Sequence, residues 1–114
     1  DPEILLLDEP SIGLDREKRR ILLKVTKQME KDGTVFVATN DLRVATTLSK
    51  TLVLVGGRLV SKGDTKTVLY GLKEEWAVLP NEIVTFVKDL RRTGVDLDQP
   101  VRPDELAKKL AERF

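Results

Sequence analysis

Short apolar runs alternate along the chain with longer segments in which apolar residues recur every three or four positions. Three of the runs, at residues 4–7, 34–39 and 51–55, contain no charged residue. A continuous apolar run of this length is typical of a strand buried on both faces, as in a parallel sheet. The pattern therefore predicts strands that alternate with helices, which is an α/β fold.

The segments that follow the first two strands have helical spacing. Residues 16–31 carry one apolar stripe, and the basic residues around it predict a solvated opposite face. The stripe consists of Ile21, Leu22, Val25 and Met29. Asp15 is a favourable N-cap for this helix, and Gly33 stands where a C′ glycine would end it. A second helix is expected over residues 41–49.

A hairpin is expected in the middle of the chain. Gly56 and Gly57 form a two-residue turn signal, so residues 58–62 should return antiparallel to the strand at 51–55. A short helix then runs to about Tyr70. The fold that results is a mostly parallel sheet with one antiparallel edge hairpin.

The last third of the chain predicts a small helical extension. Residues 71–80 are expected to be a linker. Asn81 can cap a helix that ends near Thr93, and Pro103 suits the first turn of a final helix with an apolar stripe of its own. The expected division of the chain is therefore a core at residues 1–70, a linker at 71–80 and an extension at 81–114.

Composition removes several function classes. Charged residues make up 34 % of the 114 residues, but the net charge is only +1, which argues against a nucleic-acid partner. There is no cysteine, so disulfides and thiol chemistry are excluded, and a reducing cytosol fits. No signal peptide and no apolar run of membrane length is found in the sequence.

Two acidic residues mark a candidate reaction site. Asp8 and Glu9 directly follow the apolar run 4–7, and Pro10 and Gly13 then prevent the strand from continuing. In open α/β sheets, ligands bind at the carboxyl ends of the strands. In phosphoryl transfer one such carboxylate holds Mg²⁺, directly or through water, and the other orients the attacking water. From the pair alone, a solvated loop is an equal alternative.

The flanking residues make the pattern specific. The string LLLDEPSIGLD resembles the Walker B strand and D-loop of ATP-binding-cassette (ABC) ATPases. The resemblance implies that Asp8 supports Mg²⁺, through water, and that Glu9 is the catalytic glutamate that polarises the hydrolytic water. It implies that residues 11–15, with Ser11 and Asp15, form the D-loop that reaches the nucleotide and the partner subunit. Asp15 can serve as a helix N-cap at the same time.

One position departs from that family. The ABC pattern places a switch histidine after the strand at 34–39, but this sequence has Asn40 there and no histidine at all. An amide can hydrogen-bond a phosphate oxygen, but it cannot carry the charge or the proton of an imidazole. Asn is also among the best N-cap residues, so a cap for the helix at 41–49 is the other interpretation of Asn40. The resemblance therefore does not extend to full catalytic competence.

Other family motifs are missing from the sequence. Nothing matches the phosphate loop G-x-x-x-x-G-K-[ST], and the ABC signature and Q-loop are also not found. The chain thus resembles the C-terminal half of an ABC ATPase, a P-loop NTPase fold. The resemblance implies ATP hydrolysis with Mg²⁺ that drives solute transport, by a cytoplasmic subunit bound to a second ATPase subunit and a transmembrane subunit. The isolated chain is expected to be inactive.

The extension at 81–114 indicates a subfamily. It resembles the C-terminal extension of the ATPases of energy-coupling-factor importers, in which the extension helps two ATPase subunits pair. A helical annex that only covers the core is an equal alternative. Two other functions stay open: a non-catalytic dimerisation or interaction module, and an ABC ATPase that does not serve transport.

The resemblance also implies that a central strand is missing from this chain. That strand would lie between the strands at 34–39 and 51–55, and both of these are uncharged apolar runs with nothing to protect an open edge. The two strands could pair directly, or a second copy of the chain could fill the gap. Self-association, most simply a dimer in sedimentation equilibrium, is the expected outcome.

Overall fold

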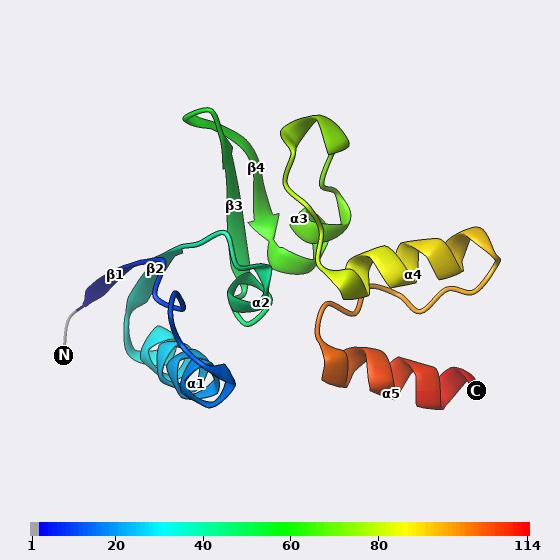
Figure 1. The fold of residues 1–114 in the computed structure, drawn as a ribbon, viewed down its shortest axis with the longest axis horizontal. Coiled ribbons are helices and arrows are strands. Elements are labelled where there is room, and N and C mark those ends of the chain that lie inside the picture. Colours follow the sequence, from blue (N-terminus) through cyan, green and yellow to red (C-terminus); the bar gives the residue numbers. More distant parts are fainter. Residues whose placement is uncertain (1–2) are drawn as a thin grey trace. The chain divides into compact units, whose positions relative to one another are not determined.

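The computed structural model describes residues 3–114, which form two compact units (Figure 1). The N-terminal unit is Asp1–Leu48 and the C-terminal unit is Ser49–Phe114. The N-terminal unit contains β1 (Ile4–Asp8), α1 (Arg16–Asp32), β2 (Thr34–Ala38) and α2 (Leu42–Ala45). The C-terminal unit contains β3 (Lys50–Val55), β4 (Arg58–Asp64), α3 (Thr65–Tyr70), a 3₁₀ turn (Glu74–Trp76), α4 (Glu82–Arg92) and α5 (Pro103–Arg113).

The N-terminal unit is a strand-helix-strand motif. β1 and β2 pair in parallel, with Ile4 opposite Thr34 and Asp8 opposite Ala38, and α1 lies against β2. Side chains alternate along both strands between half-buried and exposed. Leu6 is 72 % exposed and Phe36 is 52 % exposed. The prediction of strands buried on both faces is therefore wrong for this chain, because α1 is the only long helix among residues 3–48 and it covers one face.

Helix α1 begins as predicted and ends differently. The Asp15 side chain accepts a hydrogen bond from the Lys18 backbone N–H at 2.8 Å, which confirms the N-cap. Gly33 is not a left-handed C′ residue, since its φ of −166° is extended and the chain enters β2 at the next position. Within the predicted stripe, Ile21 is 58 % exposed, whereas Thr26 is buried. The buried side of α1 is therefore rotated away from Ile21.

The four strands form two separate sheets. β3 and β4 pair antiparallel, and the turn between them has positive φ at Gly56 (56°) and Gly57 (78°), as a tight hairpin turn requires. This confirms the predicted hairpin and the α/β class. Within residues 3–114 each unit has one two-stranded ladder, and the expected P-loop NTPase sheet stays a prediction.

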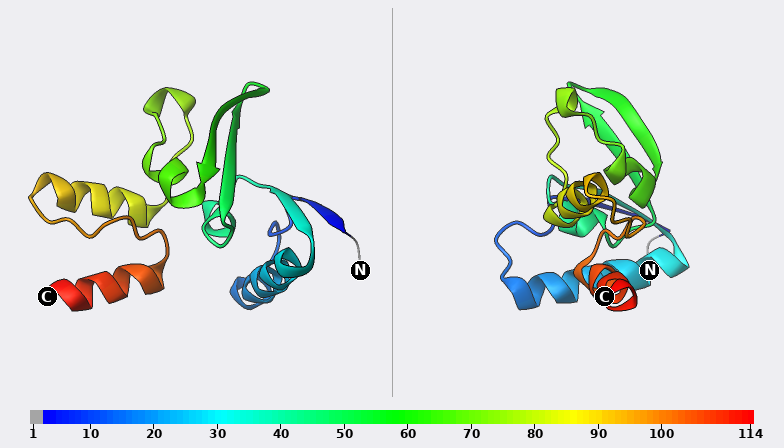
Figure 2. Two further views of the ribbon diagram at one scale, coloured as in Figure 1. Left: turned by 180° about the vertical axis from the view of Figure 1, so that it is seen from behind. Right: turned by 90° about the vertical axis from the view of Figure 1, so that its right-hand side faces the viewer.

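The C-terminal extension packs with the hairpin and α3 inside one unit. Asn81 caps α4 as predicted, accepting from the Val84 N–H at 3.1 Å, and its side-chain amide donates to the Val101 carbonyl at 2.9 Å. The Tyr70 hydroxyl donates to the Pro100 carbonyl at 2.5 Å. These two bonds attach the connection between α4 and α5 to α3 and to the start of α4. Figure 2 shows the connection running back between α4 and α5. The predicted division at residues 71–80 stays a prediction.

Apolar side chains from β3, α3, α4 and the connection between α4 and α5 make the core of this unit. Leu69 is 1 % exposed, and Val84 and Val87 are fully buried. The remaining buried apolar residues of the unit are Val53, Val68, Tyr70, Leu97 and Val101. Among residues 3–114, no helix combines the length and the apolar character that crossing a membrane requires.

The single tyrosine offers a direct test of this packing. Burial raises the pKa of Tyr70 to about 12, against a smaller opposing effect of Arg91. The stability that the neutral phenol provides should therefore be complete below pH 10 and should be lost as the pH rises through about 12. An absorbance titration of the tyrosinate should give a midpoint near 12 in the folded chain and near 10 in urea. A folded-state midpoint near 10 would contradict the buried phenol.

Candidate functional site

The carboxyl ends of β1 and β2 lie at the same edge of the parallel pair. Asp8 is the last residue of β1 and pairs with Ala38, the last residue of β2. The Glu9 backbone N–H donates to the Ala38 carbonyl at 2.7 Å, so the ladder extends one residue further. Glu9 itself has a φ of 43°, a left-handed conformation that is uncommon for a residue other than glycine. The chain therefore leaves the sheet sharply at the predicted catalytic glutamate.

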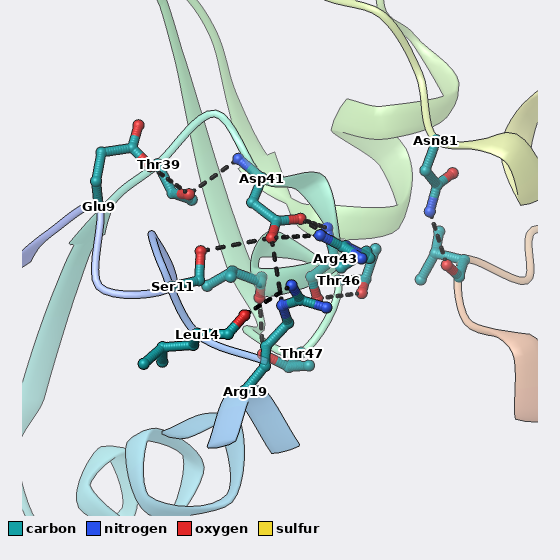
Figure 3. Close-up of polar contacts among 12 residues, drawn as sticks. Glu9, Ser11, Leu14, Arg19, Thr39, Asp41, Arg43, Thr46, Thr47 and Asn81 are labelled. Carbon is teal, nitrogen blue, oxygen red and sulfur yellow. Dashed lines mark hydrogen bonds and ion pairs between the residues drawn. The ribbon is translucent and has the colours of Figure 1, made fainter. Parts of the chain in front are cut away.

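The Glu9 carboxylate is held by the end of β2. One oxygen accepts from the Asn40 backbone N–H at 2.9 Å, and the other accepts from the Thr39 hydroxyl at 3.1 Å. The Thr39 hydroxyl oxygen in turn accepts from the Asp41 backbone N–H at 2.9 Å. Figure 3 shows the Glu9 and Thr39 side chains side by side, with Asp41 on the far side of Thr39. The fold thus brings together two positions that lie 31 residues apart in the sequence.

Asn40 is exposed, and the interpretation of Asn40 as a helix cap is wrong. The N-cap of α2 is Asp41, whose side chain accepts from the Arg43 backbone N–H at 3.0 Å. The physical reason is that a cap at Asn40 would need helical dihedral angles at Asp41, whereas the Asp41 backbone is extended, with φ −87° and ψ 101°. The helix therefore starts one residue later than a cap at Asn40 would require.

Helix α2 has four residues instead of the nine predicted for residues 41–49. The Thr46 hydroxyl donates to the Arg43 carbonyl at 2.9 Å, and the Thr47 hydroxyl donates to the Val44 carbonyl at 2.7 Å. Threonine hydroxyls that bond nearby carbonyls compete with the backbone pattern of a continuing helix. The helix accordingly ends just before the two threonines.

Asp41 connects the predicted D-loop to the end of β2. Ser11 is buried, with 6 % of its surface exposed, and its hydroxyl donates to the Asp41 carboxylate at 3.4 Å. The Arg43 side chain donates to both carboxylate oxygens at 3.0 and 3.1 Å, and Arg19 Nε lies 3.9 Å away. The Arg43 hydrogen bond, with a smaller effect of Arg19, holds the pKa of Asp41 below its usual range against the effect of burial. Asp41 is therefore charged at neutral pH.

Sequence reasoning missed four members of this network: Thr39, Asp41, Arg43 and Arg19. The motif Thr-Asn-Asp at the end of an apolar strand was the available signal, because short polar side chains there can bond nearby backbone groups. The side chain of Asp15 is engaged in capping α1, and its predicted role at a subunit interface stays a prediction.

The carboxylates at this edge can be compared with the ligands that Mg²⁺ takes when it is bound together with a nucleotide. In the described part of the chain, no three His, Cys, Asp or Glu side chains group to form a metal site. Mg²⁺ in phosphoryl transfer needs only one or two carboxylates, with water and phosphate oxygens completing its shell. Asp8 is exposed at the end of β1, and it is the carboxylate that could serve this way.

Comparison with known proteins identifies the relatives of the chain. The energy-coupling factor transporter ATP-binding protein EcfA2 of Mycoplasmopsis pulmonis is 32 % identical over 117 aligned residues, which cover 96 % of this chain and 38 % of that protein. This chain matches part of an ABC ATPase. The EcfA2 protein of Mycoplasma pneumoniae is 34 % identical over 95 residues, which cover 79 % of this chain and 31 % of that protein.

The match is not confined to one transporter type. The glutathione/L-cysteine transport system ATP-binding/permease protein CydC of Haemophilus influenzae is 38 % identical over 66 residues, which cover 58 % of this chain and 12 % of CydC. The first EcfA2 alignment covers nearly the whole chain and so includes most of the extension. The chain spans less than two fifths of the length of each of these relatives. No protein-family model matches.

Proposed function

We propose that the chain is the C-terminal part of an ATP-hydrolysing subunit of an ABC transporter of the energy-coupling-factor type. The observation that carries the proposal is Glu9, held by two hydrogen bonds at the carboxyl end of β1 in a chain whose homologues are ABC ATP-binding proteins. The β1–α1–β2 motif would then be one part of a larger P-loop NTPase sheet. The remaining strands and the phosphate loop would be supplied by residues outside the sequence printed here.

The proposed roles follow from where each side chain lies. Glu9 would orient the attacking water and accept its proton, since each of its oxygens keeps a lone pair after the bonds from Thr39 and Asn40. Asp8 would support Mg²⁺ through water. Asn40 would face the nucleotide as an uncharged hydrogen-bonding side chain. Mg-ATP, when bound, supplies the phosphoryl group that is transferred and the metal charge that stabilises its transfer.

The proposed partners are a second ATPase subunit and a transmembrane subunit, at the cytoplasmic side of a membrane. Ser11 and Asp15 would lie near the boundary with the second ATPase subunit. The exposed apolar residues of β1 and β2, such as Leu6 and Phe36, support the idea that this sheet is completed by another segment or another copy. Self-association of the isolated chain stays a prediction.

The isolated chain should bind no Mg-ATP in titration calorimetry. Asp8 and Glu9 repel a triphosphate, and the described residues contain no phosphate loop to offset this repulsion. The full-length protein that contains this chain is the positive control and should bind Mg-ATP about as tightly as enzymes usually bind substrates, with KM values of about 1 μM to 1 mM as the guide. Binding of that strength by the isolated chain would contradict its assignment as a partial cassette. A full-length protein that neither binds nor hydrolyses ATP would overturn the proposed function.

A further inference from the structure

We propose that Thr39 is a positioning residue that fixes the carboxylate of Glu9 through its side-chain hydroxyl. The inference rests on the proposed function of Glu9 and adds to it the group that orients the glutamate. The Thr39 hydroxyl lies 3.1 Å from one Glu9 oxygen, and the Asn40 backbone N–H lies 2.9 Å from the other. Both oxygens of the carboxylate are therefore held by neighbouring residues at the end of β2.

The direction of the Thr39 hydrogen bond is set by the backbone. A hydroxyl has one proton to donate and two lone pairs that accept. The Asp41 backbone N–H donates to the Thr39 hydroxyl oxygen at 2.9 Å, which leaves the hydroxyl proton for Glu9. A bond in which the acceptor is a charged carboxylate is stronger than one between neutral groups. The Thr39 hydroxyl therefore donates its proton to the Glu9 carboxylate.

The backbone of Glu9 adds a second constraint. Its N–H is bonded to the Ala38 carbonyl at 2.7 Å, and its φ of 43° is a conformation that persists only where surrounding bonds enforce it. Because β2 fixes the main chain of Glu9, only the side-chain torsion angles of Glu9 remain free to vary. The Thr39 and Asn40 donors fix these rotamers, so one short segment of β2 determines both the backbone and the carboxylate of Glu9.

Thr39 is itself held in place through Asp41. The Asp41 carboxylate bonds Arg43 and accepts from the buried Ser11 hydroxyl of the predicted D-loop. A continuous series of bonds thus runs from Ser11 through Asp41 and Thr39 to Glu9. The Asn40 side chain is not part of this series, because Asn40 contributes only its backbone N–H.

The first test measures steady-state ATP hydrolysis in the full-length protein. Thr39→Val keeps the β-branched shape and removes the hydroxyl, and it should lower kcat about tenfold while the KM for Mg-ATP changes less than about twofold. Thr39→Ser keeps the hydroxyl and should retain most of kcat. Thr34→Val makes the same chemical change at the exposed first residue of β2 and serves as the control, which should keep the parent kcat. Thr39→Val with unchanged kcat, or Thr39→Ser as slow as Thr39→Val, would overturn the proposal.

The second test needs no activity and uses this chain. Amide hydrogen exchange, followed by NMR, should accelerate at Asn40 and Asp41 in Thr39→Val, because one amide bonds Glu9 and the other bonds Thr39. Thr39→Ser should exchange like the parent sequence. Unchanged exchange in Thr39→Val would overturn the positioning role. A full-length protein without any ATPase activity would instead refute the proposed function, and the exchange result would still decide the geometry.

Discussion

Glu9→Gln is expected to stop ATP turnover in the full-length protein while nucleotide binding stays intact. Glutamine has nearly the same shape as glutamate and cannot accept a proton from water. Its carbonyl oxygen can still accept from the Asn40 N–H, and its amide can donate to the Thr39 hydroxyl oxygen. The glutamine side chain should therefore occupy the same position as the Glu9 carboxylate. Only the general base is lost, which should lower kcat by about 10²–10⁴-fold.

The measurement compares the hydrolysis rate and the affinity for Mg-ATP in the same preparations. Glu17→Gln is the matched control, because Glu17 is an exposed residue in the first turn of α1 and the charge change is identical. The control should retain the parent rate. If Glu9→Gln retained half of the activity or more, Glu9 would not be the base. If it lost binding as well, the substitution would have disturbed the site and not only its chemistry.

Leu69→Ala is expected to have the largest effect on stability. Leu69 lies in α3 at the centre of the C-terminal unit and is 1 % exposed. Removing a fully buried leucine side chain leaves a cavity and costs about 2–5 kcal/mol. Because a domain is typically stable by only about 5–15 kcal/mol, a loss of this size should shift the denaturation midpoint strongly or unfold the unit.

Leu79→Ala provides a control with the same chemical change. Leu79 is 83 % exposed, so its truncation should alter the free energy of unfolding by no more than about 0.5 kcal/mol. Urea denaturation followed by circular dichroism measures both variants. Equal effects of the two substitutions would show that Leu69 is not in a packed core.

Local chemistry explains why several elements could be predicted from the sequence. The glycine pair at the hairpin turn and the caps at Asp15 and Asn81 depend on residues within a few positions of one another. Such features are set by steric freedom and by short hydrogen bonds, which the sequence states directly. The strand positions followed in the same way, from continuous apolar runs.

Longer-range interactions explain what could not be predicted. Asn40 and Asp41 are equally good caps on chemical grounds, and the sequence does not show that the backbone stays extended through Asp41, beside a glutamate that bonds the Asn40 N–H from 31 residues away. The exposure of one face of β1 and β2 was also not predictable, because an apolar run predicts a strand but does not show which helices will cover its two faces. The Glu9, Thr39 and Asp41 contacts likewise exist only once the two strands are paired.

The contact between Asn40 and Glu9 uses the Asn40 backbone and not its side chain, which matters for substitutions at this position. Its backbone N–H holds Glu9, and every amino acid except proline supplies that same donor. A change of side chain at position 40 therefore leaves the glutamate in place and alters only what the side chain presents to its surroundings. In the proposed ATPase, substitutions at position 40 would therefore change the hydrolysis rate while the hydrogen bond that holds Glu9 stays in place.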